Sequence, residues 1–152
     1  MPPYLLGLRL RGRRVVVVGG GRVAQRRVPA LLAAGARVVL VAPEVTPSLE
    51  DLIADGRVVW ERRPYRPGDL DGAWLVQALT DDPRVNEAVA AEAERSRIWC
   101  VRADDAEASA AWTPAGGRVG EVTVGVLAGG DPRRAAGIRD AVVDGLRDAT
   151  LE

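Results

Sequence analysis

The sequence predicts an α/β protein with a doubly wound, mostly parallel sheet, and three observations support this fold class. Runs of β-branched and aliphatic residues recur along the chain, starting with four consecutive valines at Val15–Val18. Each of the early runs is followed by a segment whose apolar residues have helical spacing. Glycine, proline or capping residues mark the junctions between them. Such alternation is typical of a parallel sheet covered by helices on both faces, with right-handed crossovers.

The expected strands and helices follow in chain order. We expect strands at Arg14–Val18, Arg37–Val41, Val58–Glu61, Ala73–Leu79 and Ile98–Arg102. We expect helices at Gly21–Ala34, from Pro47 to about Asp55, and at Pro83–Glu94. Thr46-Pro47 and Asp82-Pro83 are cap-then-proline pairs, which open the second and third of these helices. The third helix is expected to place on one face Val85, Ala88, Val89 and Ala93.

Two segments flank this alternating region. The lead-in Tyr4–Arg13 carries leucines that we expect to pack under the sheet edge, namely Leu5, Leu6, Leu8 and Leu10. Beyond Asp104, residues 108–120 lack periodicity, Glu121–Leu127 is expected to be a strand, and Asp131-Pro132 starts a last helix that ends near Leu146. A lone strand and helix bury little surface, so this part is expected either to pack on the edge of the sheet or to exchange with a second copy as a dimer interface.

The composition indicates a single soluble core and argues against several classes of partner. The chain has 152 residues, no formal net charge and a hydrophobic share of 47%. It has no apolar run long enough to span a bilayer and no signal-peptide pattern, so we expect a cytoplasmic protein without membrane contact. Without a basic stripe, nucleic acid is not an expected partner. Leu151-Glu152 resembles the remnant of a cloning tag.

The residue types that are missing exclude much chemistry. All 21 basic residues are arginine, and the chain has neither lysine nor histidine and only one cysteine. A Schiff base, a P-loop lysine, a histidine-dependent triad and an imidazole or thiolate metal site are therefore excluded, and no metal site is predicted. Cys100 lies in an apolar strand and is expected to be buried and unreactive. General acid or base chemistry falls to Asp, Glu, Tyr or water.

A glycine-rich turn follows the first strand. Gly19, Gly21 and Ala24 fit G-x-G-x-x-A between an expected strand and an expected helix, the arrangement in which a helix N-terminus receives a dinucleotide pyrophosphate. The alternative is a glycine turn in a domain that has lost nucleotide binding. The acid that usually contacts the ribose is absent after the second strand, which ends in Ala42-Pro43, and either the Glu44 carboxylate or the backbone of Pro43 and Glu44 holds the nucleotide. No arginine follows this strand closely, which favours NAD over NADP.

Polar residues also follow the fourth and fifth strands, at the sheet edge where ligands bind. Thr80 and Asp81 come directly after the fourth strand, and Asp82 is better explained as a helix cap. Asp104 and Asp105 follow the fifth strand, where they form either a turn or an acid–base site. The arginine pairs are expected to be solvated, with binding of substrate carboxylates as the alternative; they are Arg26-Arg27 and Arg133-Arg134.

From Leu10 to Gly130 the chain resembles the dehydrogenase/chelatase module of siroheme synthases, the precorrin-2 dehydrogenase and sirohydrochlorin ferrochelatase family. Five stretches carry the resemblance in the right order: VVVVGGGRVAQRRV at 15–28, AGARVVLVAPE at 34–44, DLDGAWLVQALTDDPRVNEAV at 69–89, IWCVRADDAE at 98–107 and VTVGVLAGG at 122–130. The resemblance implies NAD-dependent oxidation of precorrin-2 to sirohydrochlorin, in some members followed by iron insertion. It also implies a tetrapyrrole substrate and a homodimer with interlocking tails, and in some relatives a fused uroporphyrinogen methyltransferase domain.

Carried over to this sequence, the family's site falls on a small set of residues. The nucleotide contacts fall on Gly20, Gly21, Arg22, Val23, Pro43 and Glu44, to which the motif adds Gly19 and the strand-end position adds Thr80. The family's aspartate, the general base, falls on Asp104. The chain departs from the family at two positions, where Val101 replaces an asparagine and Ala128 replaces a serine. Loss of the serine weakens the expectation of iron insertion more than that of dehydrogenation. We therefore expect an NAD-binding Rossmann domain at residues 1–107 and a dimerisation extension at 108–150. The alternative function is a non-catalytic NAD-binding or dimerisation module.

Overall fold

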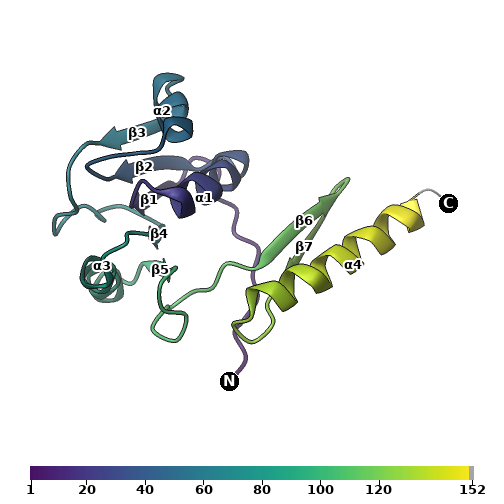
Figure 1. Cartoon of the computed structure of the whole chain (residues 1–152). Coiled ribbons are helices and arrows are strands. Elements are labelled where there is room, and N and C mark those ends of the chain that lie inside the picture. The colour runs from purple at the N-terminus through teal and green to yellow at the C-terminus, as the bar shows by residue number, and fades with distance from the viewer. Residues whose placement is uncertain (151–152) are drawn as a thin grey trace. The chain divides into compact units, whose positions relative to one another are not determined.

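A computed structural model describes residues 1–150 and divides the chain into two compact units (Figure 1). Residues 5–111 form an α/β unit, and residues 1–4 and 112–150 belong to the second unit. The expected tag remnant, Leu151-Glu152, lies outside the described residues.

The α/β unit contains one five-stranded sheet with the strand order β3-β2-β1-β4-β5, in which all neighbouring strands are parallel. The strands are β1 (Arg14–Val18), β2 (Arg37–Val41), β3 (Val58–Glu61), β4 (Leu75–Ala78) and β5 (Trp99–Arg102). The helices are α1 (Arg22–Ala33), α2 (Pro47–Ala54) and α3 (Pro83–Arg95). This arrangement confirms the predicted Rossmann-like fold class. Strands β4 and β5 are shorter than expected, whereas β1, β2 and β3 have the expected bounds.

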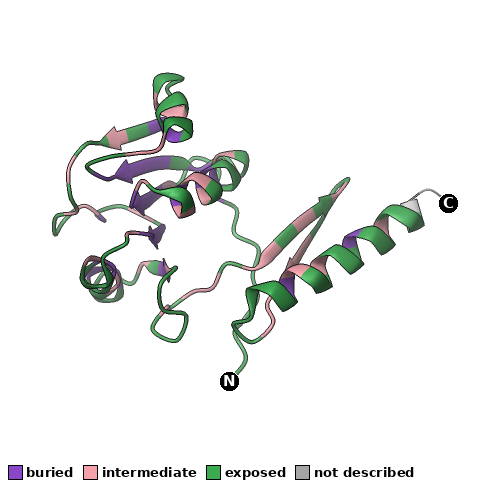
Figure 2. Ribbon diagram, in the orientation of Figure 1, coloured by how far each residue is buried: buried purple, intermediate pink, exposed green. Residues whose placement is uncertain are grey.

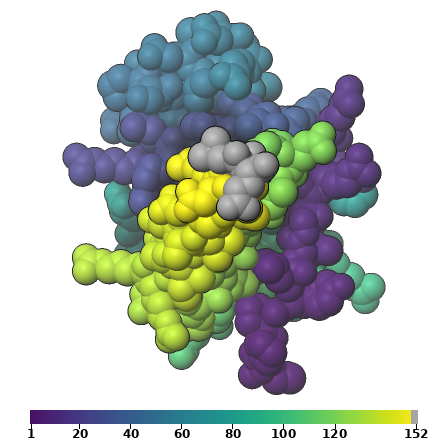
Figure 3. Space-filling view, turned by 90° about the vertical axis from the view of Figure 1, so that its right-hand side faces the viewer, coloured from purple at the N-terminus to yellow at the C-terminus, as the bar shows by residue number. Residues whose placement is uncertain are grey.

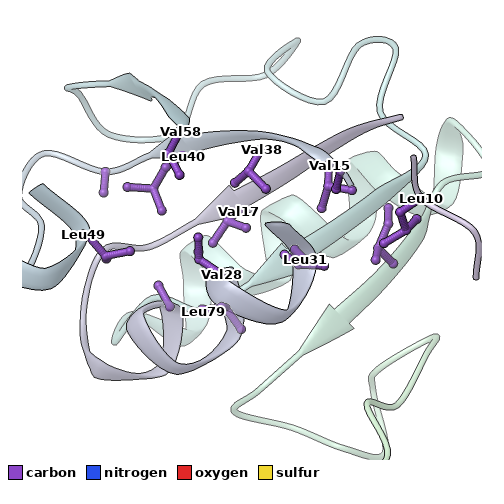
Figure 4. Close-up of a cluster of buried hydrophobic side chains, with 14 residues drawn as sticks. Leu10, Val15, Val17, Val28, Leu31, Val38, Leu40, Leu49, Val58 and Leu79 are labelled. Atoms are coloured by element: carbon purple, nitrogen blue, oxygen red, sulfur yellow. The ribbon is translucent and has the colours of Figure 1, made fainter. Parts of the chain in front are cut away.

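The alternating side chains of the strands build two cores, one on each face of the sheet. In Figure 2 the ribbons of β1, β2 and β4 are coloured largely as buried. Val15 and Val17 of β1 point toward helix α1, where Val28 and Leu31 pack against them (Figure 4). On the opposite face, Val16 and Val18 belong to the cluster that contains Val89 of α3. A valine run suits β1 because both of its faces are buried in apolar surroundings.

Two expectations about the edges of this unit were wrong. Only Leu10 of the lead-in leucines is buried, whereas Leu5, Leu6 and Leu8 are exposed, because the segment before residue 11 forms no regular element along the sheet. In α3 the predicted Val89 and Ala93 are buried and Val85 packs against the same core, whereas Ala88 is exposed. The buried face also carries Asn86 and Glu92, which were not predicted.

The second unit is a β-hairpin with a helix beside it (Figure 1). In the space-filling view of Figure 3 the atoms of this helix, coloured from lime to yellow, lie next to the green atoms of the hairpin. Strands β6 (Ala115–Val119) and β7 (Val122–Val126) are antiparallel, and α4 spans Pro132–Thr150. The sequence predicted β7 but no strand at β6, and it ended the helix too early. Strand β6 contains Gly117, where a Cβ would lie 2.8 Å from Val143 Cγ2 of α4. Close packing of the helix therefore requires glycine there, and this removes the side-chain alternation by which a strand is recognised.

Candidate nucleotide-binding site

The turn after β1 needs glycine at two positions for different steric reasons. Gly19 has φ +120°, and a Cβ on it would lie 2.7 Å from the carbonyl oxygen of Leu79 at the end of β4. Its N–H donates to the carbonyl of Val41 at 2.9 Å. At Gly20 a Cβ would overlap the carbonyl oxygen of Glu44, beyond β2. The turn is thus held closely against the ends of both strands that flank β1.

The N-terminus of α1 is open, unlike those of the other two helices of this unit. Thr46 caps α2 by accepting from the N–H of Leu49, and Asp82 caps α3 by accepting from the N–H of Arg84. The α1 N-cap is Gly21, which offers no side-chain cap, and the first turn of α1 has no acidic residue. A Cβ at Gly21 would meet no atom within 4 Å. The first N–H groups of the helix and its positive dipole end therefore suit an anion.

This helix end opens on a cavity of about 780 Å³ at the carboxyl ends of the strands. The volume falls within the range typical of small-molecule and cofactor sites. Among the residues that line it are all eight for which sequence predicted a nucleotide contact, namely Gly19, Gly20, Gly21, Arg22, Val23, Pro43, Glu44 and Thr80. Pro64, Tyr65 and Val85 also line the cavity and were missed. Asp104 is not one of the lining residues.

A polar network follows β4. Asn86 is fully buried in α3, and its Oδ1 accepts from the Thr80 backbone N–H at 3.0 Å and from the Thr80 hydroxyl at 2.7 Å. Its Nδ2 donates to the Thr80 carbonyl at 3.0 Å. Asn86 thereby sets the position of Thr80 at the cavity wall. The sequence signal for Asn86 was its spacing of three and seven residues from the buried Val89 and Ala93.

Asp104 forms a bidentate ion pair beyond β5. Arg102 donates from Nε to Asp104 Oδ1 at 3.1 Å and from Nη2 to Oδ2 at 2.9 Å. The hydrogen bonds from Arg102, with a further contribution from Asn86, hold the pKa of Asp104 below its usual range despite partial burial. Asp104 is thus a carboxylate at neutral pH, held by Arg102 through two hydrogen bonds. Asp105 instead accepts from the N–H of Ala108 and stabilises the following turn.

Two further residues considered in the sequence, Arg27 and Cys100, are buried or half-buried and lie among protein groups. Arg27 is half-buried and donates to Oε1 of Gln77 at 3.3 Å, so it is not the solvated residue that was expected. Burial lowers the pKa of Arg27, and the neighbouring Arg26 adds to this. Cys100 is buried as expected, and desolvation raises its pKa to about 11, which keeps the thiol protonated.

Across residues 1–150, no three Asp, Glu or Cys side chains gather as a metal-ligand group. Within the same residues, no helix has both the length and the apolarity to cross a membrane.

The fold and the open helix end define a dinucleotide-binding class of domain, and the comparisons agree. The chain belongs to the family described as "Putative NAD(P)-binding", whose model matches residues 6–115. The protein is 49% identical to a siroheme synthase of Chromobacterium violaceum over 108 residues, 71% of this chain and 23% of that protein. It is 44% identical to a siroheme synthase of Gluconacetobacter diazotrophicus over 131 residues, 84% of this chain and 28% of the relative.

A solved structure agrees with these relatives. The structure of "SirC, precorrin-2 dehydrogenase" has a TM-score of 0.83 and 26% sequence identity, and the match covers 94% of this chain and 71% of that one. The resemblance to the siroheme synthase module is thereby confirmed. The matched region spans only about a quarter of the two siroheme synthases, 23% and 28% of their lengths.

Proposed function

We propose that this chain is an NAD-dependent precorrin-2 dehydrogenase module that forms sirohydrochlorin. The observation that carries the proposal is the open N-terminus of α1 at a cavity lined by the glycine turn. The likeness to SirC and to siroheme synthases supplies the substrate class, a tetrapyrrole.

The residues around the cavity fit a dinucleotide. Gly21 and the first N–H groups of α1 are suited to the pyrophosphate, while Pro43 and Glu44 at the end of β2 are placed to hold the ribose next to it. Thr80, which Asn86 holds in position, follows the carboxyl end of β4, the strand that lies between β1 and β5 in the sheet. When bound, NAD supplies the hydride acceptor. We assign the cofactor contacts to these residues together with Gly19, Gly20, Arg22 and Val23.

Asp104 is proposed as the general base. Oxidation of precorrin-2 removes a hydride and a proton, and the proton needs an acceptor. Asp104 is already ionised, and Arg102 keeps its carboxylate in one orientation through two hydrogen bonds. In a chain without histidine or lysine, this is an available base at the sheet edge beyond β5.

The assembly is part of the proposal. We propose residues 1–107 as the NAD-binding domain and residues 108–150 as an extension that forms a homodimer, in a cytoplasmic protein. Support for the dimer comes from Ile138 and Val142, which lie one turn apart on α4 and are both exposed. The matched region is about a quarter of each siroheme synthase, which supports the proposal of a fused methyltransferase domain as a partner of this module.

The test is conversion of precorrin-2 with NAD by the wild type and by Asp104→Ala. The matched control is Asp105→Ala, which changes the neighbouring carboxylate that accepts from the N–H of Ala108 in the following turn. We expect loss of most activity in Asp104→Ala and retention in Asp105→Ala. Full activity in Asp104→Ala would refute the assigned base. Nucleotide binding without any turnover in the wild type would favour the non-catalytic module.

A further inference from the structure

A buried carboxylate on α3 takes no part in the chemistry described above. The side chain of Glu92 is on the core-facing side of α3, and the residue is only 8% exposed. Its Oε1 accepts from the Tyr65 hydroxyl at 2.5 Å and from the N–H of Gly68 at 2.9 Å, and its Oε2 accepts from the N–H of Leu70 at 3.3 Å. Because a carboxylate is costly to bury without donors, these three bonds hold the loop after β3 against α3.

The same loop is fixed at a second point. Arg63 donates to both oxygens of Asp69, at 2.8 and 2.7 Å, and the N–H of Arg66 donates to Asp69 Oδ2 at 2.7 Å. Leu70, the next residue, is completely buried in the core on the α3 face of the sheet. The loop therefore has a defined conformation although it contains no helix or strand.

Tyr65 connects this anchored loop with the nucleotide cavity. Its side chain is half-buried, lines the cavity together with Pro64 and Val85, and donates its hydroxyl hydrogen to Glu92. Burial and the neighbouring carboxylate raise the pKa of Tyr65 well above its usual value, so the phenol stays protonated and keeps donating. The cavity thus has an apolar wall that contains an aromatic ring in a fixed position.

The strand order shows which half of a dinucleotide meets this wall. With the pyrophosphate at the turn after β1, the nicotinamide half extends toward β4 and β5, where Asp104 lies. The adenosine half then extends toward β2 and β3, and Pro64 and Tyr65 come after β3. An uncharged planar base next to a fixed aromatic ring gains both apolar burial and ring stacking.

We propose that the ring of Tyr65 holds the adenine base of the dinucleotide and that Glu92 is the positioning residue that sets this ring. The inference rests on the proposed function only in that the cavity binds NAD. It assigns to Tyr65 and Glu92 roles that neither the glycine motif nor Asp104 implies.

The experiment is calorimetry of the whole chain with NAD and, separately, with ADP-ribose, which has the adenine but no nicotinamide. We expect Tyr65→Ala to raise the Kd of both ligands by about tenfold, the effect of one lost stacking contact. Tyr65→Phe keeps the ring and should change the Kd by less than about threefold. Glu92→Ala, which releases the ring, should raise the Kd of both ligands, while the conservative Glu92→Gln should restore most of the affinity. The matched control is Tyr4→Ala, since Tyr4 is 89% exposed and lies in the second unit.

Each outcome separates this inference from the proposed function. Unchanged affinity of Tyr65→Ala, in a protein whose wild type binds NAD, overturns the inference and leaves the proposed function standing. An effect on NAD but none on ADP-ribose places the ring at the nicotinamide half and also overturns it. A wild type that binds neither ligand overturns both. Circular dichroism and thermal unfolding identify a variant that has failed to fold. If Tyr65→Ala fails to fold, Tyr65→Leu replaces it, because leucine keeps an apolar side chain at this wall but removes the aromatic ring, and an unchanged Kd in Tyr65→Leu then overturns the inference.

Discussion

Alanine substitutions at Gly19 and Gly21 should show which glycine of the turn is needed for stability and which for NAD binding. Both residues belong to the G-x-G-x-x-A motif, but only Gly19 is closely surrounded by protein. Ala at Gly19 has to adopt φ +120° and places its Cβ 2.7 Å from the Leu79 carbonyl oxygen. The backbone conformation alone costs about 1–3 kcal/mol, and the end of β4 also has to move. We expect Gly19→Ala to lower the free energy of unfolding by about 3 kcal/mol, which corresponds to a decrease in Tm of roughly 6–12 °C.

Gly21→Ala should lose little stability but much of its affinity for NAD. Its Cβ meets nothing within 4 Å and its φ is −91°, so the only structural cost is the poorer N-cap, about 0.5–1 kcal/mol. The added methyl group, however, prevents close approach of a phosphate to the first N–H groups of α1. Loss of one charge-assisted hydrogen bond, about 1.5–3 kcal/mol, raises the Kd for NAD roughly tenfold to a hundredfold.

The assays are urea unfolding for stability and calorimetry with NAD for binding. We expect Gly19→Ala to lose more stability than Gly21→Ala, and Gly21→Ala to lose affinity for NAD while it remains folded. Unchanged NAD affinity in a folded Gly21→Ala protein would show that the pyrophosphate does not approach this turn. Equal losses of stability in the two variants would refute the steric argument for Gly19.

Three further predictions concern the polar network and the C-terminal unit. Arg102→Met should raise the pKa of Asp104, so the acidic limb of the kcat/KM profile for dehydrogenation should move to higher pH; a stationary limb would show that Asp104 is not the group that titrates. Because the folded pKa of Asp104 is lowered in the wild type, the stability gained from its pair with Arg102 is present above its ordinary pKa and lost as pH falls through the lowered value, which urea unfolding at several pH values measures. Asn86→Ala removes three buried hydrogen bonds and should cost about 2–4 kcal/mol of unfolding free energy, and a loss below 1 kcal/mol would contradict a structural role. Glu in place of Ile138 or Val142 should convert a dimer into a monomer in size-exclusion chromatography, and an unchanged elution volume would place the interface elsewhere.

Much of the α/β unit was predictable because its strands are buried on both faces. The valine-rich runs of β1 and β2 are typical of buried strands, and the bounds of both strands were predicted correctly. The glycine motif was also readable, since its strand and helix context is local in the sequence. Strand β6 was not, because Gly116 and Gly117 remove the alternation that marks a strand, and the need for glycine at Gly117 arises from packing against α4.

The parts of the site that the sequence missed depend on contacts between different elements of the fold. In the sequence Glu92 has the character of a solvated helix residue. In the structure it is covered by the loop that contains Tyr65, which lies 27 positions earlier in the chain. Asn86 is similar, since its neighbour in space, Thr80, lies on the preceding strand end. Apolar periodicity counts polar residues as outward-facing, and a buried polar residue with all its partners satisfied violates that rule.

The central claim is tested most directly by mixing the wild-type chain with precorrin-2 and NAD and by following sirohydrochlorin and NADH together. The account predicts one NADH for each sirohydrochlorin formed, with little NADH formed by Asp104→Ala. Tight NAD binding with neither product, in a protein shown to be folded, would contradict it.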